Sequence, residues 1–217
     1  MSLLLKPDDS LLFYGDSITD CGRDRASLAS LGGGYVNFIN AQLGNRLPSS
    51  ARKVINSGNG GNRIYDLESR LDADLLAHRP TVVTFLIGIN DTWRRFDRNL
   101  MSPTGEFRAA FRRILARITT EMSPAPHLVF MEPFLLPVPE DRRAWREDLD
   151  PKITVVRDLA VEFAGDLIPL DGLFAAAATR APAAYWLPDG VHPSAAGHAL
   201  VADAWLRNAG AGAVRSG

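Results

Sequence analysis

The sequence contains one cysteine, Cys21, among 217 residues. An internal disulfide is therefore excluded, and the cysteine content is compatible with the cytosol. Cys21 lies four residues after Ser17, and no general base is evident beside it in the sequence. We therefore interpret Cys21 as a small packing residue rather than a nucleophile.

Long hydrophobic runs and an excess of one charge are also lacking. No apolar run approaches the about 18 residues that a membrane span needs. The N-terminus has neither the basic region nor the small-residue cleavage site of a signal peptide, so we expect a cytoplasmic protein. The formal net charge is −1, which argues against a nucleic-acid partner because such binding needs clustered phosphate contacts.

Two local basic clusters interrupt this balance, at residues 94–98 and 142–143. They could form a clamp for an anionic substrate. We favour a solvated or intersubunit face whose arginines pair with carboxylates.

Histidine is scarce, so a candidate general base can be chosen by exclusion. His78 ends a polar helical segment, His127 opens an apolar strand, and His198 lies in an apolar C-terminal helix. Each is typical of a solvated or core-edge histidine. His192, in the segment Asp189-Gly190-Val191-His192-Pro193, is the remaining candidate. A carboxylate three residues earlier, Asp189, can hold the imidazole in the tautomer that a general base needs.

A candidate nucleophile lies near the other end of the chain. The apolar run at residues 11–14 is typical of a buried parallel strand, and it leads directly into Gly15-Asp16-Ser17. Open α/β sheets bind ligands at the carboxyl ends of their strands, which is where Ser17 falls. Taken alone, the tripeptide could equally be an ordinary turn with Ser17 as a helix N-cap.

Two further polar segments follow apolar strands and could supply an oxyanion hole. One is the glycine-rich loop at residues 56–62, and the other is Gly88-Ile89-Asn90-Asp91. Glycines let a backbone N–H approach a ligand closely, and Asn90 offers a carboxamide donor. The loop could also be a phosphate cradle or a plain turn, although it has neither P-loop nor dinucleotide-binding spacing. Asn90 could be an N-cap.

Apolar strands and amphipathic helices alternate along the whole chain. This alternation predicts an α/β fold of three layers (α/β/α), a five-stranded, parallel, flavodoxin-like sheet with helices on both faces. We expect a single domain over residues 1–217. The expected strands are residues 11–14, 53–56, 81–87, 128–132 and 167–170, and the expected helices are residues 35–43, 64–77, 105–122, 152–164 and 194–209. The proline-rich segment 123–139 is expected to give one strand and then a loop that walls the cleft.

The segments at residues 15–20, 56–62, 88–91 and 189–192 together resemble the signature blocks of the SGNH (GDSL-type) hydrolases. They occur in the family's order and cover nearly the whole chain. The resemblance implies that Ser17 is the nucleophile, His192 the base and Asp189 its orienting partner. It also implies an oxyanion hole formed by the Ser17 N–H, a glycine N–H and the Asn90 side chain. The family's glycine lies five residues after the asparagine that ends the second strand, here Asn56, which selects Gly61. Gly58 and Gly60 remain open for the same role.

Finer blocks resemble the intracellular acetylxylan esterase branch of that family. They are residues 20–23, 88–97, 133–134 and 191–198. The chain departs from the branch in its second block, where Asn59-Gly60 replaces a bulkier pair, and this affects the expected sugar contacts.

The resemblance implies a serine esterase that releases short acyl groups, most of all acetyl from xylo-oligosaccharides or related acetylated sugars, with no metal or cofactor. Trp93 and Trp186 would wall the substrate site, although core packing is the alternative for both. A lysophospholipase or thioesterase of the same superfamily is the alternative activity. A carbohydrate-binding or flavodoxin-like nucleotide-binding module is the non-enzymatic one. The sequence leaves open whether the protein forms a homo-oligomer.

Overall fold

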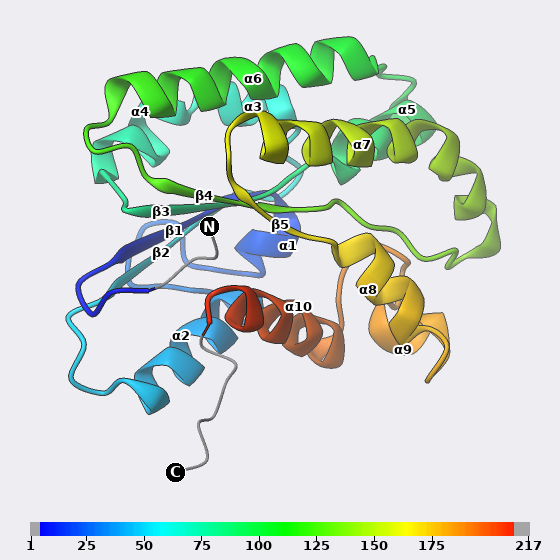
Figure 1. Ribbon diagram of the computed structural model, residues 1–217. Helices are drawn as coiled ribbons and strands as arrows, with labels where there is room; N and C mark the ends of the chain where they lie inside the picture. Colours follow the sequence, from blue (N-terminus) through cyan, green and yellow to red (C-terminus); the bar gives the residue numbers. More distant parts are fainter. Residues whose placement is uncertain (1–4, 211–217) are drawn as a thin grey trace.

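The computed structural model describes residues 5–210, and its centre is a parallel sheet of five strands (Figure 1). The strand order is β2-β1-β3-β4-β5, which is the flavodoxin-like order expected from the sequence. The strands are β1 (Ser10–Gly15), β2 (Lys53–Gly58), β3 (Val82–Leu86), β4 (His127–Met131) and β5 (Asp166–Ile168). The predicted fold class is therefore confirmed.

Alternate side chains of each strand enter two separate hydrophobic cores. In β1, Leu11 and Phe13 face one core, whereas Leu12 and Tyr14 face the other. The period of two in a strand produces this division, and burial on both faces explains why the strands read as continuous apolar runs.

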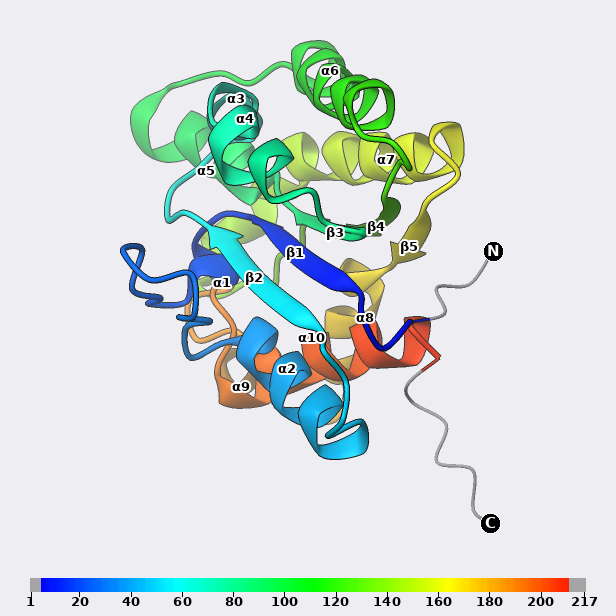
Figure 2. The same ribbon diagram turned by 90° about the vertical axis from the view of Figure 1, so that its left-hand side faces the viewer.

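Helices cover both faces of the sheet, as Figures 1 and 2 show. One face carries α2 (Tyr35–Arg46), α8 (Leu170–Ala177), α9 (Ala183–Trp186) and α10 (Ala195–Asn208). The other face carries α3 (Ile64–Ser69), α4 (Leu71–Asp74), α5 (Ile89–Arg98), α6 (Thr104–Glu121) and α7 (Arg146–Glu162). The short α1 (Ser17–Asp20) follows β1, and two 3₁₀ turns, η1 (Leu76–His78) and η2 (Glu140–Trp145), complete the elements.

The prediction of one continuous helix over residues 64–77 is wrong. The segment is broken into α3, α4 and η1, with Arg70 at the junction between α3 and α4. The segment is apolar at helical spacing throughout, so the sequence pattern does not reveal the break. Arg70 leaves the helical conformation, with φ −108° and ψ 11°, and its side chain bonds to the ends of two strands.

Other helices and strands differ from the predicted ones in their existence or in their first or last residues. Helix α5 was not expected, because only three large apolar side chains, those of Ile89, Trp93 and Phe96, mark its helical spacing among polar and charged residues. Helix α7 begins at Arg146, before the expected start at Lys152, and it accommodates Pro151. The fifth strand ends at Ile168, because Leu170 already begins α8.

Close packing at the strand ends brings the expected site segments together. Gly15 is in register with both Gly58 of β2 and Leu86 of β3. A Cβ atom on Gly15 would lie 2.5 Å from the Leu86 carbonyl oxygen, and one on Gly58 would lie 2.2 Å from the Asp20 nitrogen. Both positions therefore require glycine. The segments that leave β1, β2 and β3 consequently emerge side by side at one edge of the sheet.

Candidate active site

Ser17, His192 and Asp189 form an unbroken chain of hydrogen bonds, although Ser17 and His192 are 175 residues apart in sequence. Ser17 Oγ lies 2.9 Å from His192 Nε2, and His192 Nδ1 lies 2.7 Å from Asp189 Oδ2. The Asp189 carboxylate can only accept a hydrogen bond, so Nδ1 carries the proton and the neutral ring presents an unprotonated Nε2 to the serine hydroxyl. The arrangement can accept the hydroxyl proton of Ser17.

Electrostatics at this pair favour a charged imidazole. Partial burial alone would raise the pKa of Asp189, but hydrogen bonds from His192 and from two backbone N–H groups hold it well below its ordinary value. The hydrogen bond to Asp189 in turn raises the pKa of His192, against the opposing effects of burial and of the nearby Arg142. The pair therefore stabilises the imidazolium that forms when the ring takes up a proton.

The loop that carries Asp189 and His192 is fixed on two sides. Gly190 has φ +81°, and its carbonyl oxygen accepts a 3.0 Å hydrogen bond from the Leu136 N–H. On the other side Ser194 caps α10 by accepting from the Gly197 N–H. The proline-rich segment thus contacts the loop of the site, as its predicted place beside the cleft requires.

Ser17 is presented by the N-terminus of α1. The preceding residue, Asp16, is fully buried and caps this helix, with Oδ1 accepting from the Ile18 N–H at 3.0 Å. Its Oδ2 has no partner among the described residues. Burial raises the pKa of Asp16 to about 7. Ser17 is therefore held beside a buried carboxyl group whose charge is costly to maintain.

The glycine-rich loop offers three candidate N–H donors, and two of them are already used. The Gly58 N–H donates to Asn56 Oδ1 at 2.8 Å, and the Gly60 N–H donates to Asp20 Oδ2 at 3.1 Å. No described residue accepts from the Gly61 N–H, and Gly61 is exposed with φ +81°. Of the three alternatives, Gly61 is the one whose N–H remains available to a substrate.

Asn90 lies where the sequence predicts, shortly after the end of β3 and in the first turn of α5. Its side chain is 3 % exposed, and Nδ2 donates to the Asn62 carbonyl oxygen at 3.1 Å. An amide nitrogen carries two protons, so one remains for another acceptor. Asn62 is the neighbour of Gly61, which links the two candidate donors structurally.

Comparison with known proteins identifies the family of the chain. The model of the GDSL-like Lipase/Acylhydrolase family matches residues 13–200. The chain belongs to that family. Membership, together with the relative described next, makes it an esterase.

Two similar proteins are an acetylxylan esterase and a GDSL-like lipase. An acetylxylan esterase from Geobacillus stearothermophilus is 36% identical over 215 residues, covering 96% of this chain and 97% of the relative. The crystal structure of a GDSL-like lipase from Parabacteroides merdae superposes with a TM-score of 0.91 at 36% identity, over 97% of this chain and 100% of that one.

Solved structures of the Geobacillus enzyme superpose with a TM-score of 0.85 at 32% identity, over 97% of each chain. Variants of that enzyme in which a serine, a histidine or an aspartate is changed are described as catalytic mutants. The recognition from sequence is therefore confirmed at the level of the family and of its acetylxylan esterase relatives.

The two tryptophans expected to wall the site lie in different surroundings. The Trp93 ring lies 5.8 Å from the His192 ring and 5.4 Å from the Trp145 ring, measured between centroids. The described ring contacts of Trp186 are instead with Tyr185 and Arg180. The structure thus brings Trp93, but not the Trp186 ring, close to His192.

Most arginines of the two basic clusters have carboxylate partners, as expected. Arg94 pairs with Asp97, Arg95 with Glu147 and Asp148, and Arg143 with Glu140. Arg142 differs, since its guanidinium lies over two indole rings, 4.6 Å from the Trp93 centroid and 4.7 Å from that of Trp145. Sequence reasoning missed this position, because its signal was only a pair of adjacent arginines.

Cys21 has a histidine neighbour that sequence reasoning also missed. Its Sγ lies 3.4 Å from His198 Nε2. His198 Nδ1 accepts from the Tyr35 N–H, so the neutral ring carries its proton on Nε2 and donates toward sulfur. Burial lowers the pKa of His198 to about 4 and raises that of the Cys21 thiol. Both groups stay neutral, so the pair lacks the thiolate that a nucleophilic cysteine needs.

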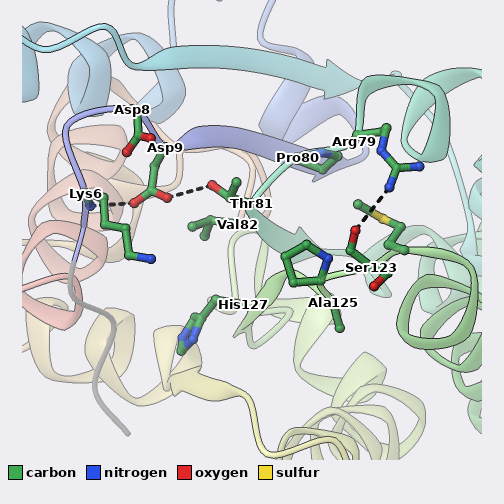
Figure 3. Close-up of a pocket in the computed structure, with 12 residues that line it drawn as sticks. Lys6, Asp8, Asp9, Arg79, Pro80, Thr81, Val82, Ser123, Ala125 and His127 are labelled. Carbon is green, nitrogen blue, oxygen red and sulfur yellow. Dashed lines mark hydrogen bonds between the residues drawn. The ribbon is translucent and has the colours of Figure 1, made fainter.

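A cavity of about 460 Å³ lies at the opposite edge of the sheet, where β3 and β4 begin (Figure 3). Asp9 forms part of its wall by accepting from the Lys6 N–H and from Thr81 Oγ1. The His127 ring lies at the cavity and pairs with Asp166 at 2.9 Å. None of the residues expected in the site lines this cavity. Its place at the amino ends of the strands separates it from Ser17.

The described residues contain no group of three or more metal-ligating side chains placed to hold a metal ion. No helix within residues 5–210 is long and apolar enough to cross a membrane.

Proposed function

We propose that this esterase removes short acyl groups, most of all acetyl, from xylo-oligosaccharides or related acetylated sugars. The observation that carries the proposal is the hydrogen-bonded chain Ser17–His192–Asp189. The acetylxylan esterase named above supports acetyl sugars as the substrate class.

In the first half of the reaction Ser17 is the nucleophile. His192 Nε2 takes the Oγ proton while Oγ attacks the ester carbonyl carbon, and the carbonyl oxygen becomes an oxyanion. The Ser17 N–H, the Gly61 N–H and the second Asn90 Nδ2 proton would donate to that oxygen. When the intermediate collapses, the bond to the sugar oxygen breaks. The proton on Nε2 passes to the sugar, which leaves the acyl group on Oγ.

In the second half water replaces the sugar. His192 Nε2 accepts a proton from water, whose oxygen attacks the acyl carbon and regenerates an oxyanion in the same place. Collapse breaks the bond to Oγ, and the proton on Nε2 returns to Ser17. The products are the acid and the free enzyme. The side chains of this chain supply the nucleophile, the base and the donors.

Trp93 supplies a flat apolar surface beside His192 on which a sugar ring can stack. The Trp186 ring packs away from the triad, so we assign it a secondary place in the wall. We also propose that the protein acts in the cytoplasm, which fractionation of the source cells would test.

The proposal is tested with a series of acyl chain lengths. An acetyl esterase gains rate from contacts with the sugar, whereas a lipolytic enzyme gains about 0.8 kcal/mol for each buried methylene of the acyl chain. We expect kcat/KM on 4-nitrophenyl esters to fall steeply from acetate to butyrate and to be negligible at octanoate. Acetylated xylo-oligosaccharides should release acetate. Activity that rises toward octanoate or lysophospholipid would replace the acetyl esterase with a lysophospholipase or thioesterase. Absence of all hydrolysis would overturn the proposed function.

A further inference from the structure

Arg70 lies beneath the candidate oxyanion hole, at the break between α3 and α4. Its side chain is 13% exposed and turns toward the carboxyl edge of the sheet. The guanidinium stacks over the Tyr14 ring, 4.4 Å from its centroid. Its nitrogens donate to five acceptors: Gly15 O, Ser57 O, Ser57 Oγ, Asn62 Oδ1 and Asp74 Oδ2.

Two of these acceptors mark the ends of neighbouring strands. Arg70 Nη2 donates to the carbonyl oxygens of Gly15 and Ser57, each at 3.0 Å. Gly15 lies two residues before Ser17, and the Gly15 oxygen also accepts from the Asn59 N–H at 3.1 Å. One guanidinium thus joins the segment that carries the nucleophile to the loop that carries Gly61.

A third acceptor leads to Asn90. Arg70 Nε donates to Asn62 Oδ1 at 2.7 Å, and the Asn62 carbonyl oxygen accepts from Asn90 Nδ2 at 3.1 Å. Asn62 also donates its N–H to the Asn59 carbonyl oxygen. Fixing Asn62 therefore fixes the residue next to Gly61 and, at the same time, the acceptor that orients the Asn90 carboxamide.

Only one of the five acceptors is a carboxylate, Asp74, whose side chain is 38% exposed. An arginine that served mainly as an ion pair would direct its planar fork at a carboxylate. Here four contacts go to neutral oxygens on the segments that present the oxyanion donors. The rigid planar fork of arginine can hold several such acceptors at once, which the single ammonium of lysine cannot.

We propose that Arg70 is a positioning residue for the oxyanion hole, acting through Asn62 on the Asn90 carboxamide and on the Gly61 peptide. This inference rests on the proposed function, because it assumes that Asn90 donates to the oxyanion. Arg70 itself touches neither the substrate nor the reacting atoms.

The test is a double-mutant cycle between Arg70→Met and Asn90→Ala, read as kcat and KM on 4-nitrophenyl acetate. Displacing a catalytic group by about 1 Å costs on the order of 100-fold in rate, so we expect Arg70→Met to lower kcat by about 10- to 100-fold with little change in KM. In the Asn90→Ala background the same change should cost clearly less than in the parent enzyme, because one of the two donors that Arg70 positions is already gone.

Two matched variants separate positioning from ion pairing. Asp74→Asn removes the one carboxylate partner of Arg70 and leaves its four neutral acceptors, so kcat should stay near that of the parent enzyme. Arg113→Met removes an exposed ion pair to Glu68 of α3, without any contact to the strand ends, and should also leave kcat unchanged. A loss of kcat in Asp74→Asn equal to that in Arg70→Met would overturn the inference.

The outcomes distinguish this inference from the proposed function. If Asn90→Ala alone retains its kcat, the oxyanion assignment fails and the inference fails with it. If Asn90→Ala loses rate but the two losses multiply, Arg70 has a structural role only. Should Arg70→Met not fold, the same cycle is run with Arg70→Lys, which keeps the charge beside Asp74 but cannot reach Gly15, Ser57 and Asn62 together.

Discussion

One carboxylate holds both the His192 ring and the turn that carries it. Asp189 Oδ2 lies 2.7 Å from His192 Nδ1, while Oδ1 accepts from the backbone N–H groups of Val191 and His192 at 2.9 and 2.7 Å. Removing the ring contact and removing the turn contacts are therefore separable changes, and they can be told apart by replacing Asp189 with Asn or with Ala.

We expect Ser17→Ala and His192→Ala each to lower kcat by several orders of magnitude, and the double variant to be no slower than either alone, since the two groups act as one unit. Asp189→Ala should cost less. Asp189→Asn, which keeps an oxygen for the turn, should unfold at a higher temperature than Asp189→Ala. Turnover of aryl acetate with active-site concentration measured independently checks the rates. Near-parental turnover by Ser17→Ala would remove Ser17 from the reaction.

Asn90→Ala should lower kcat by about 100- to 1000-fold and leave KM nearly unchanged, because a hydrogen bond to an oxyanion strengthens only in the transition state. Steady-state kinetics on 4-nitrophenyl acetate measure both constants. Asn208→Ala, at the end of α10, serves as a carboxamide control remote from the strand ends that carry the site. A rise in KM alone would make Asn90 a ground-state contact.

The pH profile should report His192 and its neighbour Arg142. The base must be neutral, and the bond to Asp189 raises its pKa, so kcat/KM should fall as pH decreases through a value above the ordinary 6.5. Arg142 lowers the pKa of His192, so Arg142→Met should move this acid limb to still higher pH. Arg142→Lys keeps the positive charge and should leave the limb near its parental position. An unchanged profile in Arg142→Met would show that the charge is not felt at the ring.

Asp16 should make the protein less stable as pH rises. Burial raises its pKa from 3.8 to about 7, so the folded state retains a proton that the unfolded state releases. Its contribution is fully present below pH 3.8 and is lost as pH rises through the folded pKa of about 7. Asp16→Asn removes this loss, which is on the order of a few kcal/mol.

Urea unfolding at several pH values between 4 and 8 measures the effect of Asp16 on the free energy of unfolding. The free energy of unfolding of Asp16→Asn should decline less over this range than that of the parent. Asp8→Asn on the surface is the matched control and should follow the parent curve. A parallel decline in Asp16→Asn would mean that Asp16 is ionised in the folded protein throughout the range.

The sheet and the order of helices and strands could be predicted, because buried segments have a recognisable pattern of apolar residues in the sequence. Residues such as Leu12 and Phe13 alternate between two cores, so β1 reads as one apolar run that ends at a glycine. The candidate site could be predicted for a similar reason. Each of its segments follows a strand, and parallel strands end at the same edge.

The remainder depends on contacts between distant residues. Arg70 breaks a helix that is continuous in its apolar pattern, because its side chain bonds to strand ends 13 and 55 residues away. Arg142 packs on Trp93 and Trp145, which lie far apart from each other in sequence. None of these pairings has a local signal.

The wide separation of Ser17 and His192 along the chain also bears on biosynthesis. A nascent polypeptide contains Ser17, the proposed nucleophile, long before His192, the proposed base, has been synthesised and α10 has packed on the sheet. That packing is fixed in part by the Trp205 Nε1–H bond to Thr84 Oγ1 at 2.9 Å. With the proposed roles of Ser17 and His192, chains that stop before His192 should be inert toward esters, because they lack the base.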